Sequence, residues 1–82
     1  MNWQLIDNVP PPKGRLLLVA FEDDNHRRDS CFATLAEDGR IYLADRPNDL
    51  IDCLSDCQSV DLEYAQLNAD EFPLFWALFV WP

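Results

Sequence analysis

The chain has 82 residues and a formal net charge of −9, with 15 acidic against six basic residues. This length fits one domain, and a composition that is 49% hydrophobic is typical of a globular chain rather than a disordered one. The acidic balance argues against direct binding to nucleic acid, because contacts to phosphate need Lys and Arg.

The first third of the chain predicts a short apolar segment, a turn and a central strand. Residues 3–6, WQLI, are mostly apolar. Three prolines follow in DNVPPPKG, where they remove backbone donors, and Gly14 closes a turn. Residues 15–22, RLLLVAFE, are a nearly continuous apolar run, which is typical of a strand covered on both faces.

A polar segment and a hairpin come next. Residues 22–29, EDDNHRRD, carry many oxygen ligands but lack the spacing of a calcium loop, so a solvated hairpin loop is expected. Residues 31–36, CFATLA, and 41–44, IYLA, predict two strands. The Asp38-Gly39 dipeptide between them favours a tight turn.

The segment DRPNDLIDCLSDCQ predicts one short helix, capped by Asn48 or Asp45, that ends near Cys57. Pro47 suits the first helical turn. Three apolar residues recur at helical spacing: Leu50, Ile51 and Leu54.

The last two segments predict strands. Residues 60–67, VDLEYAQL, alternate between apolar and acidic residues. Residues 72–82, FPLFWALFVWP, are uncharged but too short for a membrane span, which needs about 20 apolar residues. We expect a strand over residues 74–80 inside the sheet, with Trp76 buried and residues 60–67 as its candidate partner. Exposed Phe79 and Trp81 would instead indicate a docking surface or a homodimer interface.

Together these elements predict one α+β domain over residues 1–82. It would contain a small antiparallel sheet of about four to five strands with one short helix packed on it. The N-terminus has neither a basic region nor a long apolar stretch, so a cytoplasmic location is expected, with no membrane partner.

Both ends of the chain resemble a known family. Residues 3–20, WQLIDNVPPPKGRLLLVA, resemble the opening of short phage and prophage proteins known as domain of unknown function five-five-one. Members of that family close on a T-H-W-x-P-L-P signature, whose place residues 75–79, FWALF, would occupy. Only Trp76 and the apolar character match there, since Phe75 stands for the histidine and the prolines are missing. The resemblance implies an origin in a mobile element and no assigned activity.

The three cysteines, Cys31, Cys53 and Cys57, predict reduced thiols packed in the core. With His26 they make four potential zinc ligands, but the spacing is not that of a C-x2-C site. A Cys–His nucleophilic pair has nothing specific to orient it. We therefore predict no metal and no cofactor. The absence of a glycine-rich phosphate loop and the small size further predict that the protein is not an enzyme.

The acidic residues are distributed unevenly along the sequence. No basic residue follows Arg46, whereas seven acidic ones do. Like charges one helical turn apart repel, so a chain selected for stability alone would interleave Lys or Arg. We predict a continuous negative, partner-binding face formed by five residues: Asp49, Asp52, Asp56, Asp61 and Glu63.

A negative face attracts a basic surface and speeds its association. The sequence therefore favours an inhibitor of anti-defence or immunity type, phage-encoded, that occupies the nucleic-acid site of a basic protein in the host cytoplasm. The alternative is a structural or assembly module that docks through apolar surface, with the charge serving solubility. A metal-dependent regulator is a third class, which depends on the cysteines alone.

Overall fold

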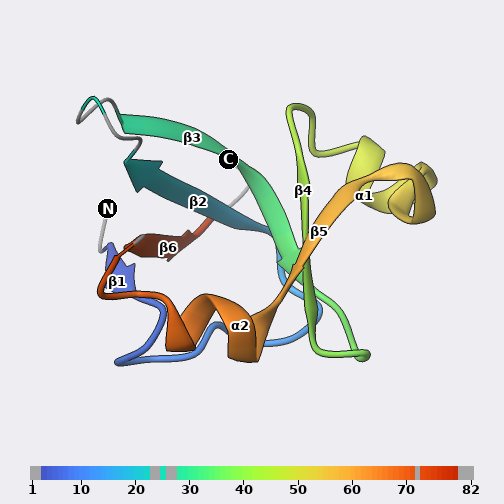
Figure 1. The fold of residues 1–82 in the computed structure, drawn as a ribbon. Coiled ribbons are helices and arrows are strands. Elements are labelled where there is room, and N and C mark those ends of the chain that lie inside the picture. Colours follow the sequence, from blue (N-terminus) through green and yellow to red (C-terminus); the bar gives the residue numbers. More distant parts are fainter. Residues whose placement is uncertain (1–2, 23–24, 26–27, 72, 80–82) are drawn as a thin grey trace.

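A computed structural model describes residues 3–22, 25, 28–71 and 73–79, with Arg28 described by its backbone alone. These residues form an antiparallel sheet and two short α-helices, arranged as in Figure 1. The strands are β1 (Gln4–Leu5), β2 (Leu17–Glu22), β3 (Arg28–Leu35), β4 (Arg40–Ala44), β5 (Gln58–Asp61) and β6 (Leu74–Leu78). The helices are α1 (Asp49–Asp52), the 3-10 turn η1 (Leu54–Asp56) and α2 (Leu62–Leu67).

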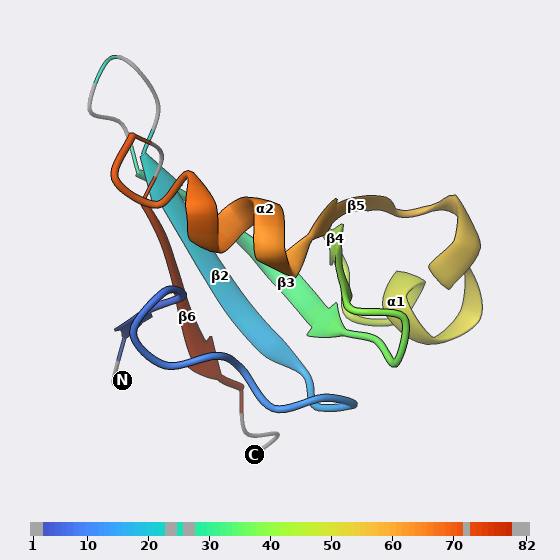
Figure 2. The same cartoon turned by 60° about the horizontal axis from the view of Figure 1, so that its bottom comes forward.

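The strands lie in the order β1-β6-β2-β3-β4-β5, and every pair is antiparallel. Strands β2 to β5 form a meander, after which α2 carries the chain back across one face of the sheet (Figures 1 and 2). The small antiparallel sheet was predicted correctly. Over the described residues it has six strands rather than four to five, and it is accompanied by two α-helices rather than one. None of the described helices is long and apolar enough to cross a membrane.

The apolar strands predicted at the two ends of the sequence meet at the middle of the sheet. Strand β2 pairs with β3 on one side and β6 on the other, as its apolar run predicts. Trp76 of β6 lies opposite both Gln4 and Val19 and is 5% exposed, which confirms its predicted burial. Its indole N–H donates to the carbonyl of Val9 at 2.6 Å. The predicted pairing of the tail with residues 60–67 is wrong.

The β3–β4 hairpin forms where the sequence predicts it. Gly39 has a φ of +83°, a left-handed conformation that residues with a side chain rarely adopt. The Asp38 carboxylate accepts from the backbone N–H of Arg40 at 2.9 Å and from the Tyr42 hydroxyl at 2.8 Å. These two bonds hold the turn to the strand that follows it.

The strand predicted over residues 60–67 is wrong beyond Asp61. Strand β5 ends there, and the Asp61 carboxylate caps α2 by accepting from the backbone N–H of Glu63 at 2.9 Å. The segment also carries apolar residues at helical spacing, since Leu62 and Ala65 both pack in the core while Tyr64 is 62% exposed. Capping together with this second pattern outweighs the alternation that favoured a strand.

The single helix predicted up to Cys57 is also wrong. It is divided at Cys53 into α1 and η1, and the side chain of Asn48 makes no capping bond. Leu50 is buried, but Ile51 is 76% exposed, so the apolar residues do not form one buried stripe. A short helix with little buried surface and repelling carboxylates gains too little to offset the cost of nucleation.

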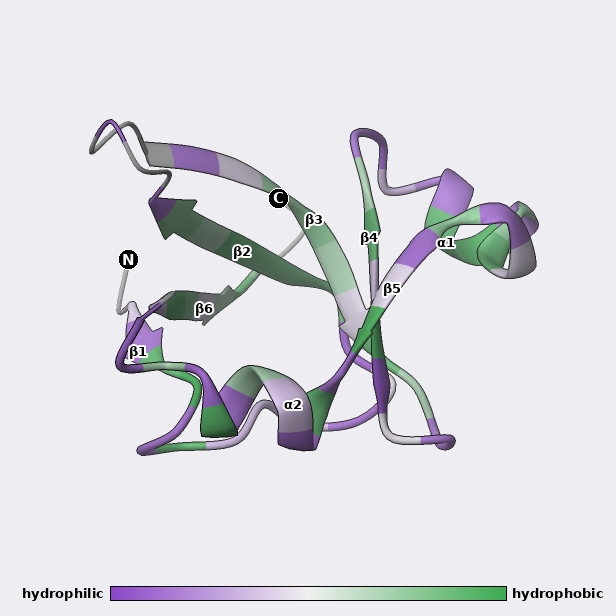
Figure 3. Ribbon diagram, in the orientation of Figure 1, coloured by the Kyte–Doolittle hydropathy of each residue, from purple (hydrophilic) through white to green (hydrophobic). Residues whose placement is uncertain are grey.

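The core lies between the sheet and two covering segments, α2 and residues 6–13 (Figures 2 and 3). Alternate residues of the central strands point toward it, and the amide of Gln66 on α2 donates to the carbonyl of Ile6 at 3.2 Å. The fully packed cluster consists of Ile6, Leu17, Val19, Ala33, Leu35, Ile41, Ala65 and Trp76. Helix α2 is short, so part of the same face, toward α1, is left uncovered.

Candidate functional site: an acidic hollow on the sheet

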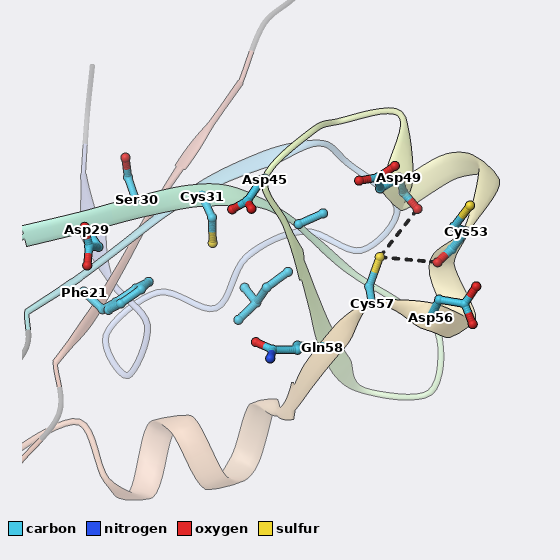
Figure 4. Close-up of a pocket in the computed structure, with 12 residues that line it drawn as sticks. Phe21, Asp29, Ser30, Cys31, Asp45, Asp49, Cys53, Asp56, Cys57 and Gln58 are labelled. Atoms are coloured by element: carbon cyan, nitrogen blue, oxygen red, sulfur yellow. Dashed lines mark hydrogen bonds between the residues drawn. The ribbon is translucent and has the colours of Figure 1, made fainter.

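A cavity of about 740 Å³, here called the acidic hollow, lies on the sheet between β3 and the segment from α1 to β5 (Figure 4). Strands β2 and β3 contribute Phe21, Asp29, Ser30 and Cys31, and the end of β4 contributes Leu43, Ala44 and Asp45. The opposite wall comes from Asp49, Cys53, Asp56, Cys57 and Gln58.

Strand alternation explains why polar groups line this part of the sheet. Asp29 and Cys31 share the face of β3 that carries buried Ala33 and Leu35. Figure 4 shows Asp29 and Cys31 on one side of β3 and Ser30 on the other. The acidic hollow is thus the continuation of the core face past the end of α2, where polar residues replace the apolar ones.

The described lining of the acidic hollow carries negative charge alone. Four aspartates line it, and among the residues that the structure describes no basic one does. Asp49 is half-buried, while Asp56 is exposed at the rim. A concave surface with one sign of charge concentrates the field and attracts groups of the opposite sign.

Two of the thiols in the acidic hollow, Cys31 and Cys57, have raised pKa values, which favours their protonated form. Burial, and then the nearby Asp45 carboxylate, raise the pKa of Cys31. Desolvation raises the pKa of Cys57, with a further contribution from Asp49. The Cys57 thiol donates to the carbonyls of Asp49 at 3.5 Å and Cys53 at 3.4 Å. A protonated thiol is a poor nucleophile and a poor metal ligand.

The cysteine predictions are confirmed in part. All three are free thiols, and Cys31 and Cys57 are half-buried, but Cys53 is exposed rather than packed in the core. Within the described part of the chain, His, Cys, Asp and Glu form no cluster of three placed to hold a metal ion. The remaining zinc candidate, His26, lies outside the described residues.

The structure divides the five acidic residues predicted as one face. Asp49 and Asp56 line the acidic hollow, whereas Asp52 is exposed but not part of its lining. Asp61 lies at the far end of β5, opposite Arg40 in the neighbouring strand, and Glu63 follows in α2. Asp61 also has a structural role as the cap of α2.

Sequence reasoning missed two of the four aspartates of the acidic hollow. Asp29 was placed in a loop, but β3 already begins at Arg28. Asp45 was considered only as a helix cap, yet it directly follows β4. The alternation of side chains along each strand could have identified both aspartates. Asp29 is an even number of residues from Leu35, and Asp45 is an even number from Ile41, so each points to the same face as a buried residue.

Compared with protein-family models, curated proteins and solved structures, the chain matches none.

Proposed function

We propose that this chain is a small, acidic, non-enzymatic binding protein that inhibits a basic, nucleic-acid-handling partner. In this proposal the acidic hollow receives Lys or Arg side chains that otherwise contact phosphate, so the partner's nucleic-acid site is occupied. An inhibitor of anti-defence or immunity type, encoded by a phage or another mobile element, would act in this way.

The observation that carries the proposal is the one-signed lining of the acidic hollow. Four aspartates, and no basic residue within the described part of the chain, line a concavity large enough for side chains of a partner. Coulomb attraction in such a concavity steers a basic surface toward it. Carboxylates on both walls could replace the phosphates that the partner's cations normally contact.

The state of the thiols favours binding over catalysis. Nucleophilic cysteine needs a lowered pKa, whereas the pKa values of Cys31 and Cys57 are raised. We therefore infer that both thiols contribute neutral, polarisable surface to the acidic hollow.

The test compares two double charge reversals of equal net charge. Asp45→Lys with Asp49→Lys changes the acidic hollow, whereas Asp52→Lys with Asp70→Lys changes exposed residues outside it. The protein captured from a host extract by wild type is identified and purified, and its association rate is measured at low and physiological salt. We expect the first variant alone to lose most of the association rate. We also expect double-stranded DNA or RNA, each tested as a competitor, to compete with wild type for the partner.

Two results would overturn the proposal. One is equal binding by the two reversal variants, which would assign the effect to net charge alone. The other is a partner from which neither DNA nor RNA displaces the protein. Circular dichroism of each variant establishes that folding is retained.

A second candidate function is an assembly module that docks through apolar surface. It is favoured by Tyr64 and Leu67, which are one turn apart on α2 and are 62% and 83% exposed. Under this alternative Tyr64→Ser with Leu67→Ser abolishes partner binding, while reversal of Asp45 and Asp49 leaves it unchanged.

A further inference from the structure

A second, smaller cavity lies at the same end of the sheet as part of the acidic hollow. It has a volume of about 300 Å³ and is here called the aromatic slot. Its lining residues are Trp3, Ala20, Phe21, Glu22, Asp29, Ser30 and Phe75. Phe21, Asp29 and Ser30 also line the acidic hollow, so the two cavities share the β2–β3 strand pair.

Strand register explains the aromatic slot. Ala20 of β2 lies opposite Phe75 of β6 on one side and Ser30 of β3 on the other, so the three side chains share one face. Ala20 and Ser30 are small, which leaves a depression beside the Phe75 ring. Trp3 precedes β1, whose Leu5 pairs with Phe75, and it supplies a second aromatic side chain to the lining.

The side chains of Phe21 and Asp29 belong to the opposite face of the same strands. Phe21 and Asp29 are register partners, and successive pairs along two strands point to opposite faces, so their side chains lie opposite to those of Ala20 and Ser30. The Asp29 carboxylate accordingly points toward the acidic hollow, as Figure 4 shows. On the face of the aromatic slot, the acidic residue is Glu22, whose register partner is Arg28.

We propose that the aromatic slot binds an alkylated ammonium group, the chemistry shared by a methylated lysine side chain and by small quaternary amines. The faces of Trp and Phe rings attract cations, and this attraction strengthens when the cation is desolvated. Trp3 is 42% exposed, so its ring is accessible to a ligand in this structure. The net charge of −9 adds a long-range field that favours cations over anions.

An alkylated ammonium suits this lining better than a guanidinium. Arginine brings five N–H donors that need acceptors, whereas on the face of the aromatic slot the side-chain acceptors in the lining are those of Glu22 and Ser30. A quaternary ammonium has no N–H donor, so its burial against aromatic rings leaves no hydrogen bond unmade. This inference is independent of the proposed function, because it concerns another cavity and a ligand that need not be part of a protein.

The experiment titrates the full chain with choline and with its neutral isostere 3,3-dimethylbutan-1-ol, followed by NMR. The indole N–H signal of Trp3 is assigned from its loss in Trp3→Phe. We expect choline to shift that signal and to bind about tenfold more tightly than the neutral isostere, the size of a cation–π contribution of this kind. A peptide with one trimethyllysine is the second probe. Stronger binding of the peptide than of choline identifies a protein side chain as the source of the group.

Two variants of Trp3 separate ring chemistry from bulk. Trp3→Phe retains an aromatic face and should retain most of the choline affinity, whereas Trp3→Leu should lose about tenfold. The proposal is overturned if choline and the neutral alcohol bind equally. It is also overturned if neither choline nor the peptide moves the Trp3 signal.

Discussion

At the scale of single residues, Asp38 links a turn to the strand after it. The backbone N–H of Arg40, and then the Tyr42 hydroxyl, lower the pKa of the Asp38 carboxyl below its ordinary value of 3.8. A carboxyl whose pKa is lower in the folded state adds stability that is fully present above the unfolded pKa. That stability is lost as pH falls through the folded pKa.

Asp38→Asn keeps an acceptor for the turn but removes the titrating group. We expect the wild type to be the more stable of the two near neutral pH, and this advantage to shrink below about pH 4. Urea unfolding of both proteins at several pH values measures the difference. Glu37→Gln, a change at the exposed neighbouring residue, is the control and should show a smaller dependence on pH. A constant difference between wild type and Asp38→Asn across the range would contradict the account.

The thiols give a second prediction at this scale. Alkylation requires the thiolate, so the raised pKa values of Cys31 and Cys57 should slow their reaction with iodoacetamide, while exposed Cys53 reacts first. Peptide mapping by mass spectrometry gives the rates. Asp45→Asn should accelerate alkylation of Cys31, because the Asp45 carboxylate raises the pKa of that thiol. Asp52→Asn should not, and equal effects of both substitutions would show that Asp45 has no specific influence.

At the scale of elements, one carboxylate decides where β5 ends and α2 begins. Asp61→Ala removes the bond to the backbone N–H of Glu63 and should lower the free energy of unfolding by about 1 kcal/mol. Asp61→Ser, which can still cap, should recover most of this loss. Glu63 is exposed, so Glu63→Ala should change the free energy of unfolding by no more than about 0.5 kcal/mol. Urea denaturation of the three variants tests the prediction, and equal losses for Ala and Ser would exclude a capping role.

The elements also show why sequence reasoning succeeds in some places and fails in others. The β3–β4 hairpin is encoded locally by the Asp38-Gly39 turn. Strand β6 is encoded by an apolar run that is stable only inside the sheet. Residues 60–67 satisfy both strand and helix periodicity, so the choice depends on the Asp61 cap and on packing of Ala65. Packing between distant segments cannot be read from a local pattern.

The candidate site depends even more on such long-range relations. Asp49 and Asp56 were predicted from their spacing on a helix that is in fact divided at Cys53. Asp29 comes from β3 and Asp45 from the end of β4, and both reach the acidic hollow through strand register rather than through sequence proximity. No spacing rule brings such residues together before the strand order is known.

Strand β6 gives the second prediction for an element. It lies between β1 and β2, so deletion of residues 73–82 removes Trp76, the pairing partner of β1 and one of the two partners of β2. Loss of one buried Trp alone costs about 3–5 kcal/mol, comparable with the whole stability of a small domain. We expect the truncated chain to show no cooperative melting by circular dichroism. Melting at the temperature of the full chain would contradict the central position of β6.

At the scale of the whole molecule, the excess of negative charge favours the binding of cations but lowers the stability of the folded state. The chain carries 15 acidic residues against six basic ones. Four of the acidic residues share one concavity, whose lining includes no basic residue among those that the structure describes. Such an excess keeps a small protein soluble and attracts cations, but it destabilises the compact state through self-repulsion. The carboxylates of the acidic hollow should therefore be less favourable for folding than carboxylates elsewhere on the surface.

The last prediction measures that difference. Asp45→Asn with Asp49→Asn should raise the free energy of unfolding by about 0.5 kcal/mol at low salt, because it relieves repulsion within the acidic hollow. The gain should vanish near 1 M salt, where the Debye length falls to about 3 Å. Asp52→Asn with Asp70→Asn removes the same charge from exposed residues outside the acidic hollow, and it should give a smaller gain. Urea unfolding at two salt concentrations distinguishes the pairs. Identical gains would mean that net charge alone matters, whereas a gain confined to Asp45 and Asp49 would mean that the acidic hollow is retained at a cost in stability, as a binding surface requires.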